Sequence, residues 1–207
     1  PRGDLTFTGC LSAQSLPWLA EYAVIGTTLF PAAASLDLAL RAAAEVGCEA
    51  VEELDLRAPL ALSGDDAVQL QVAVSAPDDE GKHELQIHSR PQGREAGEEA
   101  EWVLNAERVL SQAAIDAPEP LVAWPPPTAE PIEVDSLYER LTEAGLECGP
   151  AFQGLTCAWR DGGRIYAEVS LAEAQVHEAA CYAIHPALLD SALHGIGLAD
   201  GSQGAGG

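Results

Sequence analysis

The sequence is short of positive charge and of long apolar runs. Only 10 of its 207 residues are Lys or Arg, against 33 Asp or Glu, which gives a formal net charge of −23. A surface this negative repels phosphate backbones and anionic lipids, so we expect neither nucleic acid nor a membrane as a partner. No apolar run approaches the ~20 residues that cross a bilayer, and no basic-then-apolar leader opens the chain. We therefore expect a soluble, cytoplasmic protein.

Closely spaced cysteines are also lacking. The five cysteines are odd in number and widely separated, and no C-x-x-C occurs: Cys10, Cys48, Cys148, Cys157 and Cys181. This pattern argues against a zinc site and against a disulfide framework, so reduced thiols are expected. The hydrophobic share of 47% excludes a disordered chain. The length suffices for one large domain or two small ones.

The first half of the chain predicts one helix against an antiparallel sheet. Alternation of apolar and polar residues with period two marks half-buried strands, and Asp78 to Gly81 form a turn between two of them. Strands are expected at residues 7–11, 68–74, 85–88 and 102–110, with a β-rich segment at 21–31. A helix is expected from about Pro31 to Val46. This is the outline of an α+β unit.

The predicted helix has two distinguishable rows of side chains. Leu36, Leu40 and Ala43 are expected to form its inner face. Asp37, Arg41 and Glu45 follow one another at a spacing of four and are expected to form a charged outer row. The many alanines between them make the helix thin, so that a sheet can wrap it closely.

Proline is concentrated in one segment of the chain. Residues 117–131 contain six prolines, a density that favours an extended, semi-rigid linker. We expect Trp124 to attach this linker to the surface of one half. The predicted organisation is therefore an N-terminal half at 1–116, a linker at 117–131 and a C-terminal half at 132–207.

The second half predicts a helix, a hairpin and a further helix. Ser136 and Glu139 have the spacing of a capping box, and Gly145 is a stop signal for the helix that follows. A hairpin is expected with strands at 155–160 and 165–171. A helix that arrives at a sheet normally needs further strands to cover it. Since the chain ends shortly afterwards, we expect the second half to be incomplete.

The last predicted helix carries the clearest candidate for chemistry. It begins at His185-Pro186, where proline suits the first helical position. Asp190 and His194 lie four apart and project from one face. A neighbouring stripe of Leu189, Leu193 and Ile196 is expected to pack inward. The Asp–His pair is either an acid–base site or a solvated ion pair on the helix surface.

Several segments resemble, in order and spacing, the dehydratase domain of a modular type I polyketide synthase. They are Pro17-Trp18-Leu19-Ala20, the Gly26 to Pro31 spacing, Val51-Glu52-Glu53-Leu54 with Ala58-Pro59-Leu60, Gly149-Pro150-Ala151-Phe152-Gln153-Gly154-Leu155, and residues 185–194. The resemblance implies an α+β double hot-dog fold, in which two consecutive units each consist of a helix wrapped by an antiparallel sheet. It also implies that the last strands of the second hot dog are absent here.

The resemblance also implies a reaction. A β-hydroxyacyl thioester, carried on the phosphopantetheine arm of an acyl carrier protein, loses water to give an α,β-unsaturated thioester. The domain itself needs no cofactor and no metal. Its partners are the carrier protein and the neighbouring synthase domains, and it forms a homodimer within the synthase.

The implied site residues come from two motifs. Asp190, supported by His194, fits D-x-x-x-H and is the implied acid. The motif of the base, H-x-x-x-G-x-x-x-x-P, falls on Tyr22, Gly26 and Pro31. Tyrosine therefore stands where the family has its catalytic histidine. The implied substrate tunnel is lined by Gly26, Pro31, Cys148, Gly149, Pro150 and Phe152.

The tyrosine changes the chemistry that is available. A phenol has a pKa near ~10, which leaves about one part in a thousand ionised at pH 7, whereas imidazole has a pKa near ~6.5. Lowering the pKa of the phenol by three units requires roughly 4 kcal/mol of additional stabilisation of the phenolate. The neighbouring carboxylate of Glu21 disfavours the phenolate and therefore favours a higher pKa for Tyr22. Three smaller departures from the family are Cys148 in place of tyrosine, Asn105-Ala106 in place of His-Ala, and Pro31-Ala32 in place of Pro-Gly.

Three functional hypotheses remain open at this point. The domain is inactive or impaired in dehydration and structural in role, or it is repurposed for double-bond isomerisation or cyclisation with Asp190, or it dehydrates with a Tyr22 phenolate or a water as base. The remaining histidines offer no second base. His185 is expected to be structural, and His83, His88 and His177 are expected to be solvated.

Overall fold

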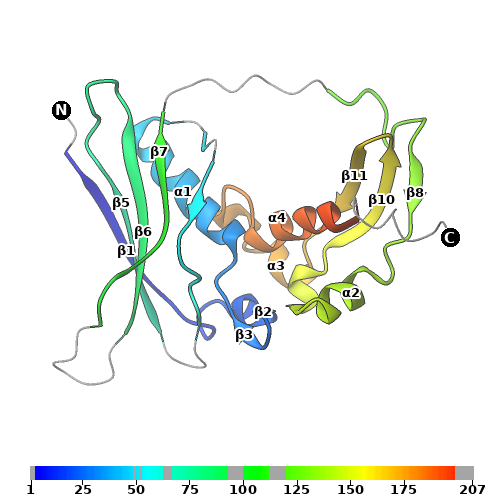
Figure 1. Ribbon diagram of the computed structural model, residues 1–207, viewed down its shortest axis with the longest axis horizontal. Coiled ribbons are helices and arrows are strands. Elements are labelled where there is room, and N and C mark those ends of the chain that lie inside the picture. Colours follow the sequence, from blue (N-terminus) through cyan, green and yellow to red (C-terminus); the bar gives the residue numbers. More distant parts are fainter. Residues whose placement is uncertain are drawn as a thin grey trace. The chain divides into compact units, whose positions relative to one another are not determined.

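The computed structural model describes residues 3–48, 50–51, 53–62, 67–92, 100–111 and 120–198. The chain divides into two compact units, Pro1–Ile115 and Asp116–Gly207, and each is described by itself. Both units combine an antiparallel sheet with helices (Figure 1). Among the described residues, no helix has both the length and the apolar content that crossing a bilayer requires.

The first unit is built on a five-stranded antiparallel sheet of order β1-β5-β6-β7-β4 (Figure 1). Its strands are β1 (Leu5–Leu11), β4 (Asp55–Leu56), β5 (Val68–Val74), β6 (His83–Pro91) and β7 (Val103–Leu110). Every second residue of β5 is buried, as the alternation predicts. The predicted turn is confirmed: Asp78 Oδ1 accepts hydrogen bonds from the backbone N–H groups of Glu80 and Lys82, at 2.9 and 2.8 Å.

Helix α1 (Ala32–Val46) packs on this sheet, with Pro31 as N-cap and Gly47 in the left-handed conformation at its end (φ 83°). The predicted helix is confirmed; its predicted inner face is correct at Ala43 and wrong at Leu36 and Leu40. The residues buried against the sheet include Ala39, Ala42, Ala43 and Val46, while Leu36 and Leu40 are only half-buried. Small alanines let the sheet come close to the helix axis, so the longer leucines are displaced to the margins.

The predicted outer row of α1 is also wrong at one residue. Asp37 is 3% exposed, and its carboxylate lies 3.1 Å from Arg41 Nε. A buried carboxylate needs such a partner, because desolvation of an unpaired charge is costly. Spacing alone groups Asp37 with Arg41 and Glu45, but only Arg41 and Glu45 are exposed.

A short hairpin precedes α1 and carries Tyr22. The 3₁₀ helix η1 (Pro17–Glu21) buries Trp18 and leads into β2 (Tyr22–Val24), which pairs with β3 (Thr27–Thr28). Ile25 and Gly26 both have positive φ angles, 49° and 72°, in the turn between the strands. Turns with two positive φ angles match the twist of the flanking strands, which explains the glycine in this β-rich segment.

The second unit contains a three-stranded antiparallel sheet of order β11-β10-β8. Its strands are β8 (Glu130–Ile132), β10 (Leu155–Asp161) and β11 (Arg164–Val169), and a turn at Gly162 (φ 58°) joins the last two. The predicted hairpin is confirmed. Leu137, Leu155, Ala158 and Leu198 form the core of the unit.

The described part of the proline-rich segment packs on this sheet. The Trp124 ring makes edge contacts with Trp159 and Tyr166, at centroid distances of 5.6 and 6.1 Å. The Trp124 indole N–H donates a hydrogen bond to Glu168. Trp124 therefore attaches the segment to one half of the chain, as predicted, and β8 begins within residues expected to be linker.

The helical elements of the second unit are short. They are α2 (Leu137–Glu143), η2 (Pro150–Phe152), α3 (Glu173–Val176), η3 (Ala179–Cys181), α4 (Pro186–Leu193) and η4 (His194–Leu198), and strand β9 (Leu146–Cys148) follows α2. The predicted capping box does not form, since Ser136 makes no side-chain cap bond. Its ψ of 5° lies outside the extended region that an N-cap normally adopts.

Helix α4 buries a different face from the one predicted. Leu193 and Ile196 are 45% and 65% exposed, whereas Asp190 and His194 are 6% and 7% exposed. The predicted inward stripe is therefore wrong at Leu193 and Ile196, while its third member, Leu189, is half-buried. The alternative of a solvated ion pair on the helix surface is excluded, because Asp190 and His194 are buried. Ala187 and Ser191 lie fully buried one turn apart, so the face with the smallest side chains packs closest and carries Asp190 and His194 inward.

Candidate active site

The second unit gathers five polar or polarisable side chains at α4. We call them the Asp190 cluster: Asp190 and Ser191 from α4, His194 at its end, Cys148 from β9 and Tyr138 from α2. Three of the five, Asp190, His194 and Cys148, were singled out from sequence motifs. The structure brings these three together in the interior of the unit.

Asp190 and His194 are close but not aligned. His194 Nε2 lies 3.2 Å from Asp190 Oδ2, within ion-pair distance. The contact lacks hydrogen-bond geometry, which leaves Asp190 Oδ2 buried without a hydrogen-bond partner among the described residues. The other ring nitrogen of the histidine, His194 Nδ1, is likewise buried without such a partner among them. Such groups are costly in a protein interior, and they concentrate at functional sites. A buried carboxylate oxygen with an unused lone pair can exchange a proton with a bound molecule.

Cys148 contributes a neutral thiol to the cluster. Its Sγ lies 3.7 Å from His194 Nε2. Burial, together with the negative charge of Asp190, raises the pKa of Cys148 to about 12. The thiol therefore stays protonated at physiological pH and is a poor nucleophile, since the thiolate is the reactive form.

This protonation state gives a direct prediction for alkylation. At pH 8, we expect iodoacetamide to modify exposed Cys10, Cys157 and Cys181 at least about 100-fold faster than Cys148. The protection disappears in 6 M guanidinium, because the unfolded thiol recovers its ordinary pKa. Peptide mass spectrometry measures each site separately, and buried Cys48 is the internal control. Rapid labelling of Cys148 in the native protein contradicts the prediction.

Ser191 and Tyr138 hold the cluster in place, and neither was identified from the sequence. The Ser191 hydroxyl accepts a hydrogen bond from the backbone N–H of Gly154 at 3.1 Å. It donates a hydrogen bond to the backbone carbonyl oxygen of Phe152 at 3.0 Å. The Tyr138 hydroxyl accepts from Leu155 N–H at 3.0 Å, and burial raises its pKa. Its ring makes an edge contact with His194 at 5.7 Å. In the sequence, the only feature that could have identified Ser191 as a site residue is its position directly after Asp190.

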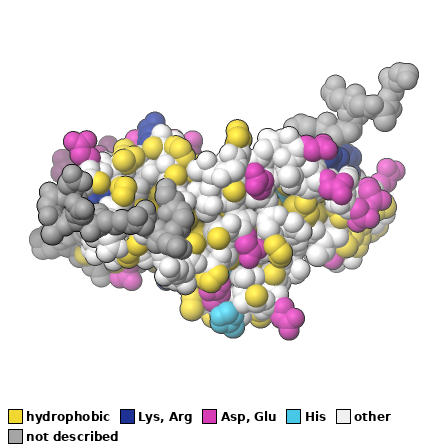
Figure 2. Space-filling model, turned by 90° about the horizontal axis from the view of Figure 1, so that it is seen from below, with side chains coloured by type: hydrophobic (Ala, Val, Ile, Leu, Met, Phe, Trp, Pro, Cys, Tyr) yellow, Lys and Arg dark blue, Asp and Glu magenta, His cyan; other side chains and the backbone are white. Residues whose placement is uncertain are grey.

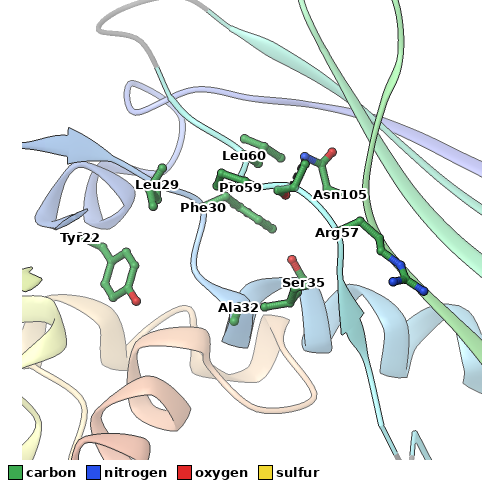
Figure 3. Close-up of a pocket in the computed structure, with 11 residues that line it drawn as sticks. Tyr22, Leu29, Phe30, Ala32, Ser35, Arg57, Pro59, Leu60 and Asn105 are labelled. Carbon is green, nitrogen blue, oxygen red and sulfur yellow. Dashed lines mark hydrogen bonds between the residues drawn. The ribbon is translucent and has the colours of Figure 1, made fainter. Parts of the chain in front are cut away.

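The first unit has a pocket of about 330 Å³ at Tyr22, which we call the Tyr22 pocket (Figure 3). Tyr22 and Arg57 lie at opposite ends of the view, with apolar side chains between them. The full lining is Tyr22, Leu29, Phe30, Ala32, Ser35, Leu56, Arg57, Ala58, Pro59, Leu60 and Asn105. Arg57 Nε donates a hydrogen bond to Glu107 Oε1 at 2.7 Å. The side-chain amide of Asn105 donates a hydrogen bond to Ala58 O at 3.3 Å. An apolar chain with polar groups at its ends suits such a pocket.

The residues expected to line a substrate tunnel have clear local roles. Gly26 occupies the hairpin turn, and Pro31 is the fully buried N-cap of α1. Gly149 and Pro150 start η2, and Phe152 is fully buried within the second unit. Their assignment to a tunnel remains a prediction.

The other histidines were predicted with mixed success. His185 is structural, as expected: it is buried, and its Nδ1 accepts a hydrogen bond from Ala187 N–H at 3.2 Å, which caps α4. His177 is exposed, as expected. His83 is not solvated but 6% exposed, with Nδ1 2.8 Å from Ser75 O, because it shares the inward face of β6 with Leu85 and Ile87. His88 is half-buried. In the described parts of the chain, no group of three or more potential ligands is arranged to hold a metal ion.

A helix packed on an antiparallel sheet, present once in each unit, defines an α+β protein of the hot-dog class. Residues 1–90 match the family described as polyketide synthase dehydratase domain, and residues 116–206 match the polyketide synthase dehydratase N-terminal domain. The chain belongs to the dehydratase domains of modular polyketide synthases, and its fold is a double hot dog.

Individual relatives support this assignment. Polyketide synthase GfsB of Streptomyces halstedii is 46% identical over 99% of the chain, and pikromycin synthase component PikAII of Streptomyces venezuelae is 45% identical over 94%. The chain spans 4% and 5% of the length of these relatives. A solved dehydratase structure from work on the borrelidin and fluvirucin synthases is 42% identical with a TM-score of 0.90, over 97% of this chain and 70% of that one. A bifunctional dehydratase-cyclase domain from ambruticin biosynthesis is 40% identical with a TM-score of 0.85, over 95% and 69%.

Proposed function

We propose that this domain binds 3-hydroxyacyl thioesters on an acyl carrier protein and is inactive or strongly impaired in dehydration. The observation that carries the proposal is an intact acid cluster combined with tyrosine at the motif position of the base. Asp190 is buried beside His194 with an oxygen that has no hydrogen-bond partner among the described residues. Tyr22 lines the pocket of the first unit.

Dehydration requires two proton transfers. A base removes the proton on the carbon next to the thioester, and an acid protonates the departing β-hydroxyl. In the proposal, Asp190 retains the second role with His194 in support, and the first has no adequate group. A phenol ordinarily has a pKa of ~10, which corresponds to ionisation of about one molecule per thousand at pH 7. General-base assistance is worth about 10²–10⁴-fold in rate, so its loss slows the reaction by that order.

The substrate and partners follow from the same proposal. The acyl chain arrives on the phosphopantetheine arm of the carrier protein, so the domain holds no cofactor of its own. The Tyr22 pocket, about 330 Å³, lies at the lower end of the ~300–1,000 Å³ typical of ligand pockets. Its apolar middle suits the acyl portion of the thioester. Neighbouring synthase domains and a second copy of the chain complete the proposed assembly.

The decisive experiment is an assay for loss of water. The protein that carries this chain, at its natural length, is incubated with a 3-hydroxyacyl carrier-protein thioester and followed by intact-protein mass spectrometry. We expect turnover below about 0.01 s⁻¹, at least 100-fold under the lower end of the ~1–10³ s⁻¹ range of ordinary enzymes. Turnover within that range overturns the proposal and favours a dehydratase that uses a Tyr22 phenolate or a water as base.

A second candidate is double-bond isomerisation or cyclisation of the carrier-bound chain with Asp190. The likeness to a bifunctional dehydratase-cyclase domain, at 40% identity, favours it. Both reactions need a positioned proton donor, which the Asp190 cluster offers. If this candidate holds, Asp190→Asn abolishes an isomerised or cyclised product in the same assay. Asp37→Asn, which changes another buried helical aspartate, serves as the matched control and leaves the product unchanged.

A further inference from the structure

The Tyr22 pocket contains a single charged side chain. Of the described residues that line it, only Arg57 carries a charge, and none is an aspartate or a glutamate. This lining contrasts with the whole chain, which has 33 acidic and 10 basic residues. Acidic side chains are also spread over the face shown in Figure 2, where basic ones are few. The pocket therefore offers an anionic group an environment that such an acidic surface does not.

Arg57 lies at a solvent-accessible end of the pocket. Its side chain is 53% exposed, and in Figure 3 its guanidinium lies at the end of the view opposite to Tyr22. The residues between these two ends are mostly apolar, among them Phe30, Pro59 and Leu60. A ligand whose apolar part fills the middle of the pocket therefore brings its outer end to the guanidinium.

The guanidinium of Arg57 is held on one side only. The backbone N–H of Arg57 donates a hydrogen bond to Asn105 O at 2.8 Å, which fixes the base of the side chain to β7. Its Nε donates to Glu107 Oε1 at 2.7 Å. Among the described residues, its two terminal amino groups have no hydrogen-bond or ion-pair partner. An arginine fixed at Nε presents its outer edge in one orientation, so its remaining N–H donors are available to a ligand.

The carboxylates near Arg57 lie along a different groove. Arg57 also borders a groove of about 390 Å³ on strands β4, β6 and β7, whose charged residues include Asp55, Glu84, Glu107 and Arg108. None of these four is among the described residues that line the Tyr22 pocket. Glu107 neutralises part of the charge of the guanidinium from the groove side. A ligand in the pocket therefore reaches the guanidinium without first meeting a carboxylate.

A planar guanidinium recognises oxygen anions by paired hydrogen bonds. Arginine binds carboxylates and phosphates in a bidentate manner, and hydrogen bonds to charged groups contribute more than those between neutral groups. An acyl thioester on a carrier protein has two places for such an anion. One is the phosphodiester of the phosphopantetheine arm, and the other is a carboxylate at the end of the acyl chain. Both present an oxygen anion at one end of an apolar chain.

We propose that Arg57 forms an anion subsite at the rim of the Tyr22 pocket and binds an anionic end of the acyl thioester. The proposal rests on the proposed function in placing such a thioester in this pocket, and it is independent of the rate of water loss. Arg57 acts on binding alone and takes no part in proton transfer. Glu107 orients the guanidinium and competes with the ligand for its charge.

Calorimetric titration with three probes tests the subsite and identifies its anion. The natural-length protein is titrated with a 3-hydroxyacyl thioester of pantetheine, which is neutral, and with the same thioester of phosphopantetheine. The third probe is a pantetheine thioester whose acyl chain ends in a carboxylate. We expect at least one of the two anionic probes to bind about tenfold more tightly than the neutral one. A gain for the phosphorylated probe assigns the subsite to the carrier arm, and a gain for the carboxylated probe assigns it to the acyl chain.

Substitutions separate the subsite from packing. We expect Arg57→Gln to lower the affinity for the anionic probe to that for the neutral one, because the charged contact is lost. Arg108→Gln, which changes the other arginine of the adjacent groove, is the matched control and keeps the gain. Glu107→Gln removes the competing carboxylate and raises the affinity for the anionic probe at least about twofold.

The wild-type protein provides a check that needs no variant. Raising the salt concentration from about 0.05 M to about 0.5 M lowers the gain at least threefold, because salt screens an exposed ion pair. Equal affinity for all three probes, a gain that persists in Arg57→Gln, or a gain insensitive to salt overturns the proposal and leaves the proposed function standing. Failure of every probe to bind contradicts the proposed function itself, and the subsite with it.

Discussion

Replacing Tyr22 by histidine raises the rate of water loss from a 3-hydroxyacyl carrier-protein thioester at least about 100-fold. An imidazole with a pKa near ~6.5 is mostly in its basic form at pH 7, whereas a phenol is ionised in about one molecule per thousand. The acid cluster is already assembled around Asp190, with His194 Nε2 3.2 Å from its carboxylate. The substitution therefore restores the one group that the proposed mechanism lacks. Intact-protein mass spectrometry of the bound acyl chain measures the rate.

Two further variants separate chemistry from packing. Tyr22→Phe keeps the ring and removes the hydroxyl, so it leaves the low rate unchanged if Tyr22 takes no part in proton transfer. Asp190→Asn in the Tyr22→His background removes the gain, because the acid is lost. If Tyr22→Phe lowers the wild-type rate tenfold or more, the phenol takes part in the reaction and the proposed impairment is contradicted.

Gly154→Ala destabilises the second unit by about 3 kcal/mol, at the upper end of what overpacking costs. A methyl group at this position would overlap the backbone carbonyl oxygen of Ser170 and lie 3.0 Å from Ser191 Oγ. The backbone cannot move away easily, because Gly154 O accepts a hydrogen bond from Ser170 N–H at 2.8 Å. Ser191 adjoins Asp190, so the strain also reaches the Asp190 cluster. Denaturant unfolding followed by tryptophan fluorescence measures the loss.

Gly163→Ala is the matched control. Gly163 lies in the β10–β11 turn of the same unit, has no heavy atom within 4 Å of an added Cβ, and does not have a positive φ. We expect its unfolding free energy to change by less than about 0.5 kcal/mol. Equal stability of the two variants would show that the close approach at Gly154 is relieved without cost.

Local chemistry made much of the secondary structure predictable. Alternation located β5 and β6, since a strand with one buried face fixes its period at two. Pro31 and Gly47 mark the two ends of α1 because each favours a backbone conformation found at helix ends. The capping box at Ser136 failed, because a cap depends on the path by which the chain enters the helix.

The candidate site was predictable in part. Motifs identified Asp190, His194 and Cys148, and the structure brings them together within one unit. Ser191 and Tyr138 were missed, because their hydrogen bonds reach Gly154 and Leu155, which are distant in sequence. A sequence pattern reports on neighbours one or two helical turns away and carries no signal for such contacts.

The sequence by itself determined the α+β class, the strand periods and the two ends of α1, and its resemblance to the family implies a histidine at the position of Tyr22. Only the tertiary structure decided which face of each helix is buried. In both α1 and α4 the row of small side chains faces inward and the leucines lie at the margin or in solvent. Close packing favours burial of the helix face whose small side chains let neighbouring elements come nearest to the helix axis. In α4, burial of that face also places Asp190 and His194 in the interior.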